Sequence, residues 1–221
     1  MKTALIIGAS GGIGAALCAA LSGRGVSVTG LSRSVDGFDL RDPQTVDRAL
    51  SALADPFDLV VVATGALSID GAEPEKTVRA IDPDAMMAQF AVNAVGPALI
   101  LRHVARLLPR DRRAVCAVLS ARVGSIGDNR IGGWTSYRAA KAAVNQIVHT
   151  TAIELARTHK HAACVSLHPG TVATEFTRKY LGRHPAVPAT EAADNLLRVV
   201  DGLGPEQSGG FFDWAGKEIP W

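Results

Sequence analysis

TALIIGASGGIGAAL, residues 3–17, decides the fold, because it joins an apolar run to a glycine-rich turn and a second apolar run. Residues 3–8 are apolar on both alternating faces, which is typical of a strand buried on both sides of a sheet. The glycines allow a tight turn, and residues 12–24 have helical spacing. The stretch therefore predicts a strand, a turn and a helix, the opening unit of an α/β domain.

The same alternation continues to the end of the chain. Apolar runs rich in β-branched residues recur at 26–31, 58–63, 114–120 and 162–167. Helical patterns lie at 43–54, 84–108, 134–158 and 189–202. This order predicts a doubly wound α/β fold of the Rossmann type, with a parallel sheet of about seven strands and helices on both faces. In such a sheet the ligand site lies beyond the carboxyl ends of the strands.

Length and composition predict one soluble domain. The 221 residues are 48% hydrophobic and 20% charged, which suits one well-buried α/β domain spanning 1–221. The net charge is only +2 and the arginines are scattered, so we expect a small-molecule ligand and neither nucleic acid nor a membrane as partner. No apolar run approaches the ~18 residues that span a bilayer, and the N-terminus has no signal-peptidase site. We expect a cytoplasmic protein.

The cysteines and histidines do not indicate a metal site. Cys18, Cys116 and Cys164 lie far apart inside apolar runs, as reduced core residues of a cytosolic protein do. His159 and His161 lie in a polar helix end, and the other histidines have no ligand-spaced partners. We expect neither a disulfide nor a bound metal.

The glycine turn has the spacing that binds a dinucleotide. Gly8, Gly12 and Gly14 in GASGGIG follow one predicted strand and open a helix, and a second strand is predicted at 26–31. Glycines there let backbone N–H groups approach a pyrophosphate at the helix N-terminus. We expect the following turn residues to contact such a cofactor: Gly8, Ser10, Gly12, Ile13 and Gly14.

The end of the second predicted strand indicates which dinucleotide is bound. An acidic residue there would bind a ribose 2′-hydroxyl, whereas this chain reads GLSRS at 30–34. Ser32 and Arg33 are suited to a 2′-phosphate, although Arg33 is also typical of a solvated surface arginine. The missing carboxylate favours NADP(H) over NAD(H). Five further residues are expected to contact the cofactor: Asp39 and Leu40 in FDLRD, and Ala63, Thr64 and Gly65 after the run 58–63.

SYRAAK, residues 136–141, places Tyr137 and Lys141 four positions apart on a predicted helix. Residues at this spacing lie on one face, within reach of each other. An ammonium group beside the phenol would lower its pKa from the usual ~10 and make Tyr137 a general acid near neutral pH. Trp134, at the start of the same helix, is expected either to line the substrate pocket or to serve only the structure.

Together these motifs resemble the short-chain dehydrogenase/reductase family over nearly all of the chain. The family's glycine turn, adenine-pocket acid and Tyr-x-x-x-Lys pair match the residues above, and its asparagine matches Asn93 in FAVNAVGP. Its Pro-Gly segment matches HPGTVAT, in which Pro169, Gly170, Val172 and Thr174 would flank the nicotinamide. Segments 120–145 and 208–221 are similar to the branch that contains the C-factor-like proteins and the Sniffer-type carbonyl reductases.

The resemblance implies an NADP(H)-dependent oxidoreductase that reduces a small aldehyde or ketone to an alcohol. In that mechanism Tyr137 donates a proton to the carbonyl oxygen while the carbonyl carbon accepts hydride from the nicotinamide. Lys141 lowers the pKa of Tyr137 and binds the nicotinamide ribose, and Asn93 holds a water that relays protons from the lysine. The family also implies a homodimer or homotetramer. Residues 172–190 are expected to form a short substrate flap.

VLSARVGS, residues 118–125, departs from the family at its catalytic serine, where this chain has Ala121. Ser120 points to the opposite face of an extended strand and is a poor substitute. Ser125 follows the flexible Gly124 and is the better candidate for the substrate oxygen, with water or backbone donors as the remaining alternatives. The substitution also supports a second hypothesis, a nucleotide-sensing or signalling protein of the same fold with little turnover.

Overall fold

All five apolar runs form strands of one parallel sheet. The structure, a computed structural model, describes residues 1–180 and 185–221. The five strands are β1 Thr3–Ile7, β2 Ser27–Leu31, β3 Leu59–Val62, β4 Ala114–Leu119 and β5 Ala162–His168. A further strand, β8 Phe211–Asp213, pairs in parallel with β5. The predicted doubly wound sheet is therefore confirmed, with six strands in the main sheet where about seven were expected.

The strand order creates a switch point at the middle of the sheet. The order is β2-β1-β3-β4-β5-β8, so the connections run outward in opposite directions from β1 and β3. Loops that leave the carboxyl ends of these two strands diverge and leave a crevice between them. In open α/β sheets ligands bind in this crevice.

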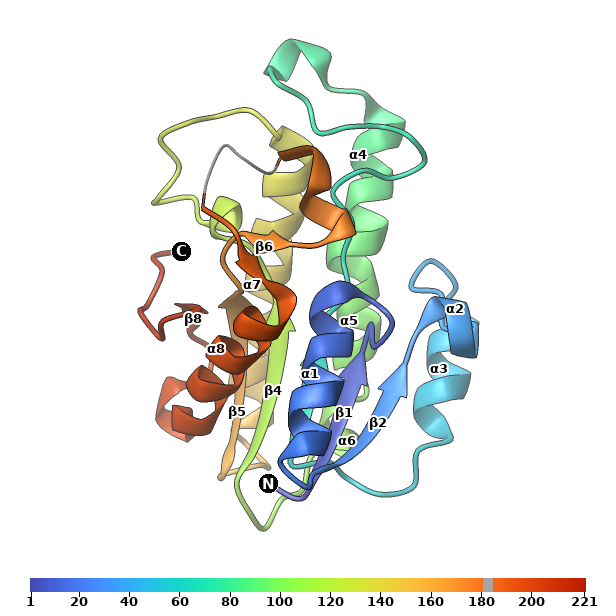
Figure 1. The fold of residues 1–221 in the computed structure, drawn as a ribbon, viewed down its shortest axis with the longest axis vertical. Helices are drawn as coiled ribbons and strands as arrows, with labels where there is room; N and C mark the ends of the chain where they lie inside the picture. The colour runs from blue at the N-terminus through green and yellow to red at the C-terminus, as the bar shows by residue number, and fades with distance from the viewer. Residues whose placement is uncertain (181–184) are drawn as a thin grey trace.

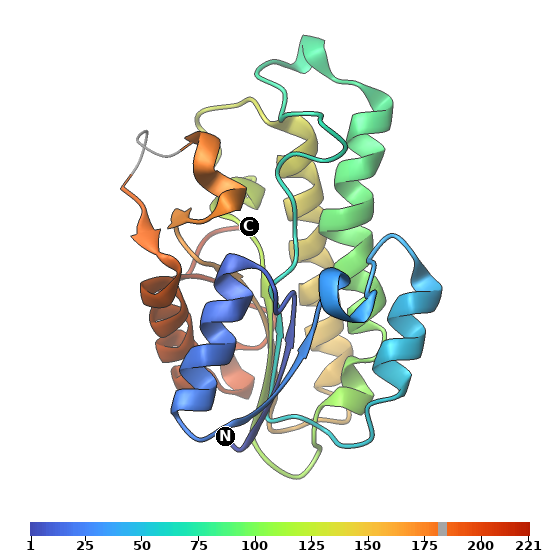
Figure 2. The ribbon, with the colours of Figure 1, turned by 45° about the vertical axis from the view of Figure 1, so that its right-hand side comes forward.

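Helices cover both faces of the sheet (Figures 1 and 2). One layer consists of α1 Gly12–Gly23 and α8 Ala189–Gly202. The other contains α3 Pro43–Ser51, α4 Pro83–Phe90, the π-helix η2 Ala91–Val95, α5 Gly96–Leu101, α6 Val104–Leu107 and α7 Thr135–Leu155. Leu5 and Ile7 pack on the α7 side, whereas Ala4 and Ile6 pack against α1 and α8. This double-sided burial explains why the strands are apolar at consecutive positions.

The helix predicted at 84–108 is interrupted by the π-helix η2 and again after Leu101. Within it, the run Pro83–Leu101 has 19 residues and a mean hydropathy of 1.3, which is long and apolar enough to cross a membrane. This finding corrects the expectation that no apolar run approaches such a length. The hydropathy has a structural cause, since Ile100 and Leu101 pack into the core and the polar Asn93 is buried in the same run.

The predicted flap at 172–190 contains short regular elements. β6 Val172–Ala173 pairs in parallel with β7 Val187–Pro188, and the 3-10 helix η4 Glu175–Tyr180 follows β6. Residues 181–184 of the predicted flap lie outside the described residues. The other short elements lie in connections: α2 Arg33–Asp36, η1 Val78–Ala80, η3 Arg122–Gly124 and η5 Pro205–Gln207.

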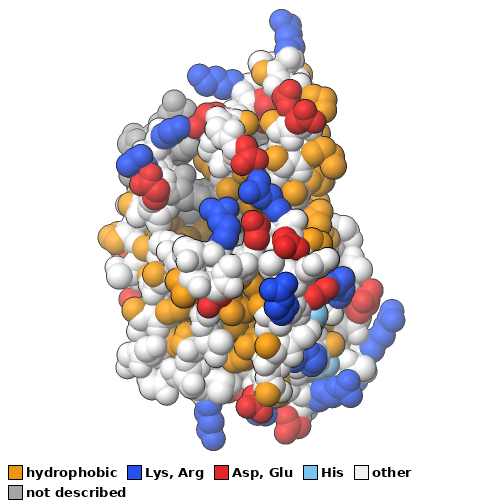
Figure 3. All heavy atoms as spheres, turned by 90° about the vertical axis from the view of Figure 1, so that its right-hand side faces the viewer, with side chains coloured by type: hydrophobic (Ala, Val, Ile, Leu, Met, Phe, Trp, Pro, Cys, Tyr) orange, Lys and Arg blue, Asp and Glu red, His pale blue; other side chains and the backbone are white. Residues whose placement is uncertain are grey.

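Charges of both signs are mixed on the surface. Figure 3 shows the face on the right-hand side of Figure 1, where Lys and Arg side chains are interspersed with Asp and Glu side chains. No single sign dominates this face. The mixture accords with the small net charge of +2.

Candidate active site

The glycine turn between β1 and α1 has no room for side chains. Gly8 has a φ of 93°, and its N–H donates a 2.8 Å hydrogen bond to the carbonyl of Leu31. A Cβ on Gly8 would lie 2.6 Å from the Ala63 carbonyl oxygen, and one on Gly14 would lie 2.1 Å from the Gly8 carbonyl oxygen. Only glycine avoids these clashes. The helix α1 then begins at Gly12 without a side-chain cap, which leaves its first N–H groups available to a ligand.

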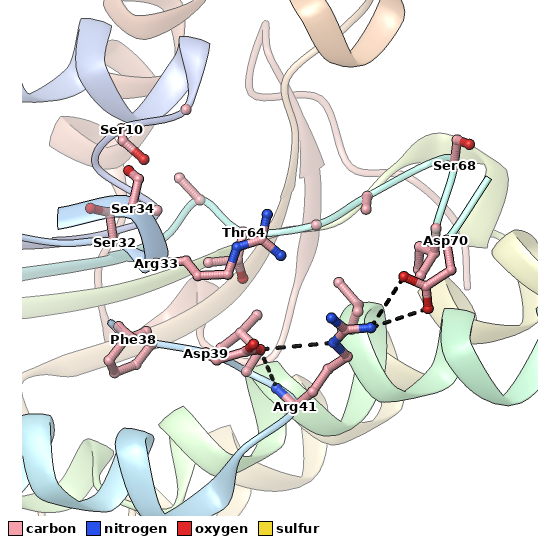
Figure 4. Close-up of a pocket in the computed structure, with 18 residues that line it drawn as sticks. Ser10, Ser32, Arg33, Ser34, Phe38, Asp39, Arg41, Thr64, Ser68 and Asp70 are labelled. Carbon is pink, nitrogen blue, oxygen red and sulfur yellow. Dashed lines mark hydrogen bonds and ion pairs between the residues drawn. The ribbon is translucent and has the colours of Figure 1, made fainter. Parts of the chain in front are cut away.

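A cavity of about 480 Å³ lies beside this turn, at the carboxyl ends of β1, β2 and β3 (Figure 4). Nine of the predicted cofactor residues line it: Gly8, Ser10, Ser32, Arg33, Asp39, Leu40, Ala63, Thr64 and Gly65. The other lining residues were not predicted: Gly11, Ser34, Phe38, Arg41, Ala66, Ser68, Ile69, Asp70 and Val92. The predicted Gly12, Ile13 and Gly14 belong to the first turn of α1 and do not line the cavity.

Arg33 and Ser32 differ in their availability to a ligand. The Arg33 side chain is exposed and extends toward the centre of the cavity (Figure 4). It forms no hydrogen bond or ion pair with the part of the chain that the structure describes. The Ser32 hydroxyl is engaged, because it accepts from the Val35 N–H and donates to Asp36 Oδ2, each at 3.3 Å. Ser32 thus caps α2, and Arg33 is the group left to bind an anion.

Two carboxylates in the same cavity hold Arg41. Its Nη1 lies 3.1 Å from Asp70 Oδ2 and its Nε lies 3.9 Å from Asp39 Oδ1 (Figure 4). The position of Arg41 next to Asp39 and Leu40 in FDLRD could have drawn attention to it. Asp70 comes from a different loop, and no local pattern predicts the contact.

The structure brings Lys141 and Asn93 together at Gly65, with Tyr137 beside the lysine. Lys141 Nζ lies 5.8 Å from the ring centroid of Tyr137 and donates a 3.1 Å hydrogen bond to the Leu119 carbonyl. A Cβ on Gly65 would lie 2.9 Å from Asn93 Oδ1 and 3.4 Å from Lys141 Nζ. Because Gly65 also lines the cavity, Lys141 and Asn93 lie next to it.

Burial dominates the electrostatics of the tyrosine and lysine. Burial raises the pKa of Tyr137 well above its usual value. Burial also lowers the pKa of Lys141 to about 8. The direction for Tyr137 is opposite to the predicted one, because desolvation of the phenolate outweighs the attraction of an ammonium that also binds Leu119. Near pH 7 the phenol therefore keeps its proton and Lys141 is charged.

Asn93 fastens the loop that follows β3. Its amide donates to the Ala66 carbonyl at 2.8 Å and to Gln89 Oε1 at 2.7 Å. Its Oδ1 accepts from the Ala66 N–H at 3.1 Å. Gln89 in turn donates to the Leu67 carbonyl at 2.8 Å. Asn93 lies in the π-helix η2, and such local bulges in a helix frequently occur at functional sites.

Ser120 and Ala121 follow β4 and point to opposite sides. Ala121 has extended backbone angles, with φ −147° and ψ 146°. Ser120 is buried on the side of Val118, which packs in the core beneath α7. Its hydroxyl has no hydrogen-bond partner among residues 1–180 and 185–221. The side that faces away from this core is occupied by the methyl group of Ala121.

The C-terminal segment engages the hydroxyl of Ser125, which was the predicted substitute for the catalytic serine. Ser125 is 2% exposed, and its Oγ donates to the Pro220 carbonyl and accepts from the Asp128 N–H at 3.0 Å. Next to it, the Gly127 N–H donates to the Trp221 carbonyl at 2.8 Å. The sequence reasoning missed this fold-back contact. Ser125 could reach a substrate only if its bond to Pro220 broke.

The Pro-Gly segment follows β5 and passes close to the glycine turn. Gly170 has a φ of 81°, and Val172 is buried at 2% exposure. A Cβ on Gly12 would lie 2.6 Å from the Thr174 Cγ2, so Thr174 touches the start of α1. None of Pro169, Gly170, Val172 and Thr174 lines the 480 Å³ cavity.

A second cavity of about 310 Å³ adjoins the first. The two share Gly65, Ala66 and Ser68. The remaining lining residues are Leu67, Glu73, Glu175, Arg178 and Lys179. The ion pair between Lys179 and Glu73 joins η4 to the loop after β3 on this side. This cavity therefore lies between η4 of the predicted flap and the loop after β3.

Comparison with known sequences shows the family to which the chain belongs. The family model described as short chain dehydrogenase matches residues 35–183. The 1-hydroxy-2-glutathionyl-2-methyl-3-butene dehydrogenase of Rhodococcus sp. (strain AD45) is 30% identical over 236 residues, which cover all of both chains. The C-signal of Myxococcus xanthus is 38% identical over 144 residues, which are 64% of this chain and 81% of that protein.

Solved structures share the fold over the whole chain. A putative short-chain dehydrogenase/reductase from Burkholderia multivorans with bound NADP has a TM-score of 0.84 and 27% identity, and covers 100% of this chain and 99% of its own. The carbonyl reductase Sniffer of D. melanogaster has a TM-score of 0.81 and 19% identity, with 100% of both chains covered, which is a likeness of fold. These similarities confirm the resemblance found in the motifs. The chain belongs to the short-chain dehydrogenase/reductase family.

Proposed function

We propose that this oxidoreductase uses NADPH to reduce a small aldehyde or ketone to an alcohol. The observation that carries the proposal is that Lys141 and Asn93 meet at Gly65, with Tyr137 beside the lysine, next to a cavity that begins at the glycine turn. A protein that only binds a nucleotide has no need of a proton-transfer set at this place. The retained set therefore favours catalysis.

The cavity is suited to NADP(H). The turn at Gly8 and Gly14 admits only backbone, and the uncapped N–H groups of α1 provide donors for a pyrophosphate. Arg33 extends into the cavity and is suited to the 2′-phosphate, and the Burkholderia multivorans protein, 27% identical, holds NADP. When bound, the nicotinamide would supply the hydride. We expect the nicotinamide to be flanked by the residues of the Pro-Gly segment, because Thr174 in this segment touches the start of α1. These residues are Pro169, Gly170, Val172 and Thr174.

The chain's own residues would then transfer the proton to the substrate. Tyr137 donates the phenolic proton to the carbonyl oxygen as negative charge develops on it. The raised pKa of Tyr137 keeps this proton on the phenol at neutral pH, which is the protonation state that reduction requires. Charged Lys141 beside the ring stabilises the phenolate that forms. A water relay at Asn93 stays a prediction, and the backbone of Asn93 would have to hold it, because its side chain is fully engaged.

Arg33→Ala is expected to raise the Kd of NADPH by about 10- to 100-fold and to leave the Kd of NADH nearly unchanged. A charged hydrogen bond contributes roughly 1.5–3 kcal/mol, and only NADPH carries the phosphate that would receive it. Titration of nucleotide fluorescence measures both constants. Arg24→Ala is the matched control, because Arg24 is a partly exposed arginine paired with Asp201. Equal losses for the two nucleotides would contradict the assignment of Arg33.

The reductase activity is expected to fall as the pH rises through about 8. Below that pH Lys141 carries its proton and its positive charge, and above it the charge beside Tyr137 is lost. The phenol keeps its proton throughout this range because its pKa is raised. The measurement is kcat/KM against pH, and Lys141→Arg, which stays charged, should move the alkaline limb upward. If the alkaline limb of the profile stays at the same pH in an active Lys141→Arg variant, a group other than Lys141 titrates there.

A nucleotide-sensing or signalling protein is the second candidate function. Ala121 favours it, because the substitution removes the family's usual contact to the substrate oxygen. The similarity to the C-signal of Myxococcus xanthus also favours it. Such a protein would bind NADPH and turn over little. The proton-transfer set leads us to place the reductase first.

The deciding experiment is NADPH and NADH oxidation by the purified protein over a panel of aldehydes, ketones and diketones. The panel includes, in the oxidative direction with NADP⁺, the glutathionyl alcohol for which the Rhodococcus relative is named. Turnover with NADPH above the background of Tyr137→Phe supports the reductase. NADPH binding without such turnover on any substrate favours the sensing function.

Assembly, location and metal dependence stay predictions. A homodimer or homotetramer would cover apolar side chains that are exposed here, such as Met87 on α4 and Ile153 on α7. A cytoplasmic location is expected from the sequence. No group of three or more histidine, cysteine or acidic side chains that could hold a metal occurs in the described ranges 1–180 and 185–221.

A further inference from the structure

We propose that Trp134 limits the size of the carbonyl substrate and that Glu75 and Arg138 hold its indole beside Tyr137. This inference rests on the function proposed above. Trp134 immediately precedes α7, and its ring meets the ring of Tyr137 edge-on, with centroids 6.2 Å apart and planes at 72°. The indole therefore occupies space next to the proton donor. A substituent on the carbonyl carbon has to fit beside it.

The backbone of Trp134 has a conformation that bulky residues avoid. Its φ is 55° and its ψ is 38°, in the left-handed region. Gly132 and Gly133 before it are also left-handed, with φ values of 70° and 66°. A third glycine would adopt this conformation without strain, whereas a tryptophan persists there only if its surroundings hold it. The strained position points to a role for the indole itself.

Glu75 supplies the first constraint on Trp134. The Glu75 carbonyl accepts a 2.5 Å hydrogen bond from the Trp134 N–H. Its carboxylate accepts from the Ser136 N–H at 3.2 Å and from the Ser136 hydroxyl. Negative charge is favourable at this helix N-terminus. Glu75 thus ties the loop after β3 to the start of the catalytic helix.

Arg138 supplies the second constraint from within α7. Its Nε donates to the Gly133 carbonyl at 2.8 Å, and its Nη2 donates to the Gly132 carbonyl at 3.2 Å. Its Nη1 donates to the Val123 carbonyl at 3.2 Å. The loop is therefore fastened on the N-terminal side of Trp134, while Glu75 fastens the residue itself. With both sides held, the indole is in place before a substrate binds.

The test compares kcat/KM for 2-naphthaldehyde and benzaldehyde. Trp134→Gly removes the indole and keeps the left-handed conformation, and the ratio of the two constants should rise about tenfold or more. Trp134→Phe restores an aromatic ring and should return the ratio toward that of the parent protein. Ile131→Gly is the matched control, because Ile131 lies on the same loop and is 87% exposed. An unchanged ratio in active Trp134→Gly would overturn the proposal.

Glu75 is tested as a positioning residue by the same ratio. Glu75→Gln keeps an acceptor for Ser136 and should preserve the ratio. Glu75→Ala removes the contacts of the carboxylate to Ser136 and should move the ratio toward that of Trp134→Gly. A role confined to stability would lower Tm in Glu75→Ala and leave the ratio of the two substrates unchanged. That result would remove Glu75 from the proposal.

Nitration of Tyr137 separates this proposal from the proposed function. If the parent protein reduces neither aldehyde, the reductase is still tested on the wider panel, and the contact between Trp134 and Tyr137 can be measured without a substrate. Tetranitromethane nitrates accessible tyrosine rings, and peptide mass spectrometry locates the product. Trp134→Gly should raise the rate of nitration at Tyr137 about tenfold or more, because it uncovers the ring that the indole meets edge-on. An unchanged rate would overturn the shielding role of the indole.

Discussion

Tyr137→Phe is expected to lower kcat for carbonyl reduction by about 10²- to 10⁴-fold, the range that positioned general acids contribute. The substitution removes the phenolic proton from a ring that lies 5.8 Å from Lys141 Nζ, and it leaves the ring and its packing in place. The Kd of NADPH should change little, because Arg33 and the glycine turn hold the far end of the cofactor in the proposed arrangement. Single-turnover oxidation of bound NADPH measures the loss in the chemical step directly.

The matched control for this variant is Thr151→Val, which removes a hydroxyl elsewhere on α7, where Thr151 donates a 2.8 Å hydrogen bond to the Ile147 carbonyl. It should leave the single-turnover rate within about twofold of the parent value. If Tyr137→Phe reduces substrates as fast as the parent protein, the proton comes from another group. The proposed roles of Tyr137 and Lys141 would then both fail.

Ala121→Ser is expected to raise kcat/KM by about 10²- to 10³-fold, which reverses the usual cost of removing one oxyanion donor. Ala121 is half-buried with extended backbone angles, so a serine adopts the same conformation without strain. Its hydroxyl would leave the strand on the side opposite Ser120. Steady-state reduction of the best aldehyde in the panel measures the gain. An Ala121→Ser variant that folds and shows no gain would place the substrate oxygen elsewhere.

Ser125→Ala decides between the two roles of Ser125. If the hydroxyl only anchors the C-terminal segment, the variant should lose roughly 1 kcal/mol of unfolding free energy and keep its kcat. If the hydroxyl contacts the substrate, kcat should fall by about 10²-fold or more. Thermal unfolding and steady-state kinetics on the same preparation distinguish the outcomes. We expect the first, because Pro220 receives the only proton that the hydroxyl carries.

The predicted strands, helices and nucleotide turn follow from local patterns. Residues at 3–8 must be apolar on both faces to lie between two helix layers, and Gly8 and Gly14 leave no space for side chains. The i, i+4 spacing of Tyr137 and Lys141 likewise places them together within one helix. These features depend on neighbours in sequence. They are therefore readable without the structure.

Contacts between distant segments could not be predicted in this way. Ser125 donates a hydrogen bond to the Pro220 carbonyl, and Arg41 forms an ion pair with Asp70. The Glu75 carboxylate accepts from the Ser136 N–H at the start of the catalytic helix. The strand β8 has three residues, too short for a periodic pattern. The helical run Pro83–Leu101 is a further example. Its hydropathy alone does not show that other segments pack over Ile100 and Leu101 in the core.

The sequence by itself determined the fold class, the dinucleotide turn and the tyrosine–lysine pair, because each is set by spacing along one strand, turn or helix. Only the tertiary structure decided which hydroxyls are free and in which direction the pKa of Tyr137 shifts. Ser32 and Ser125 are engaged by other groups, and burial raises the pKa of Tyr137 where proximity to Lys141 alone predicted the opposite. Desolvation and hydrogen-bond partners depend on everything packed around a side chain, and those neighbours come from all parts of the chain.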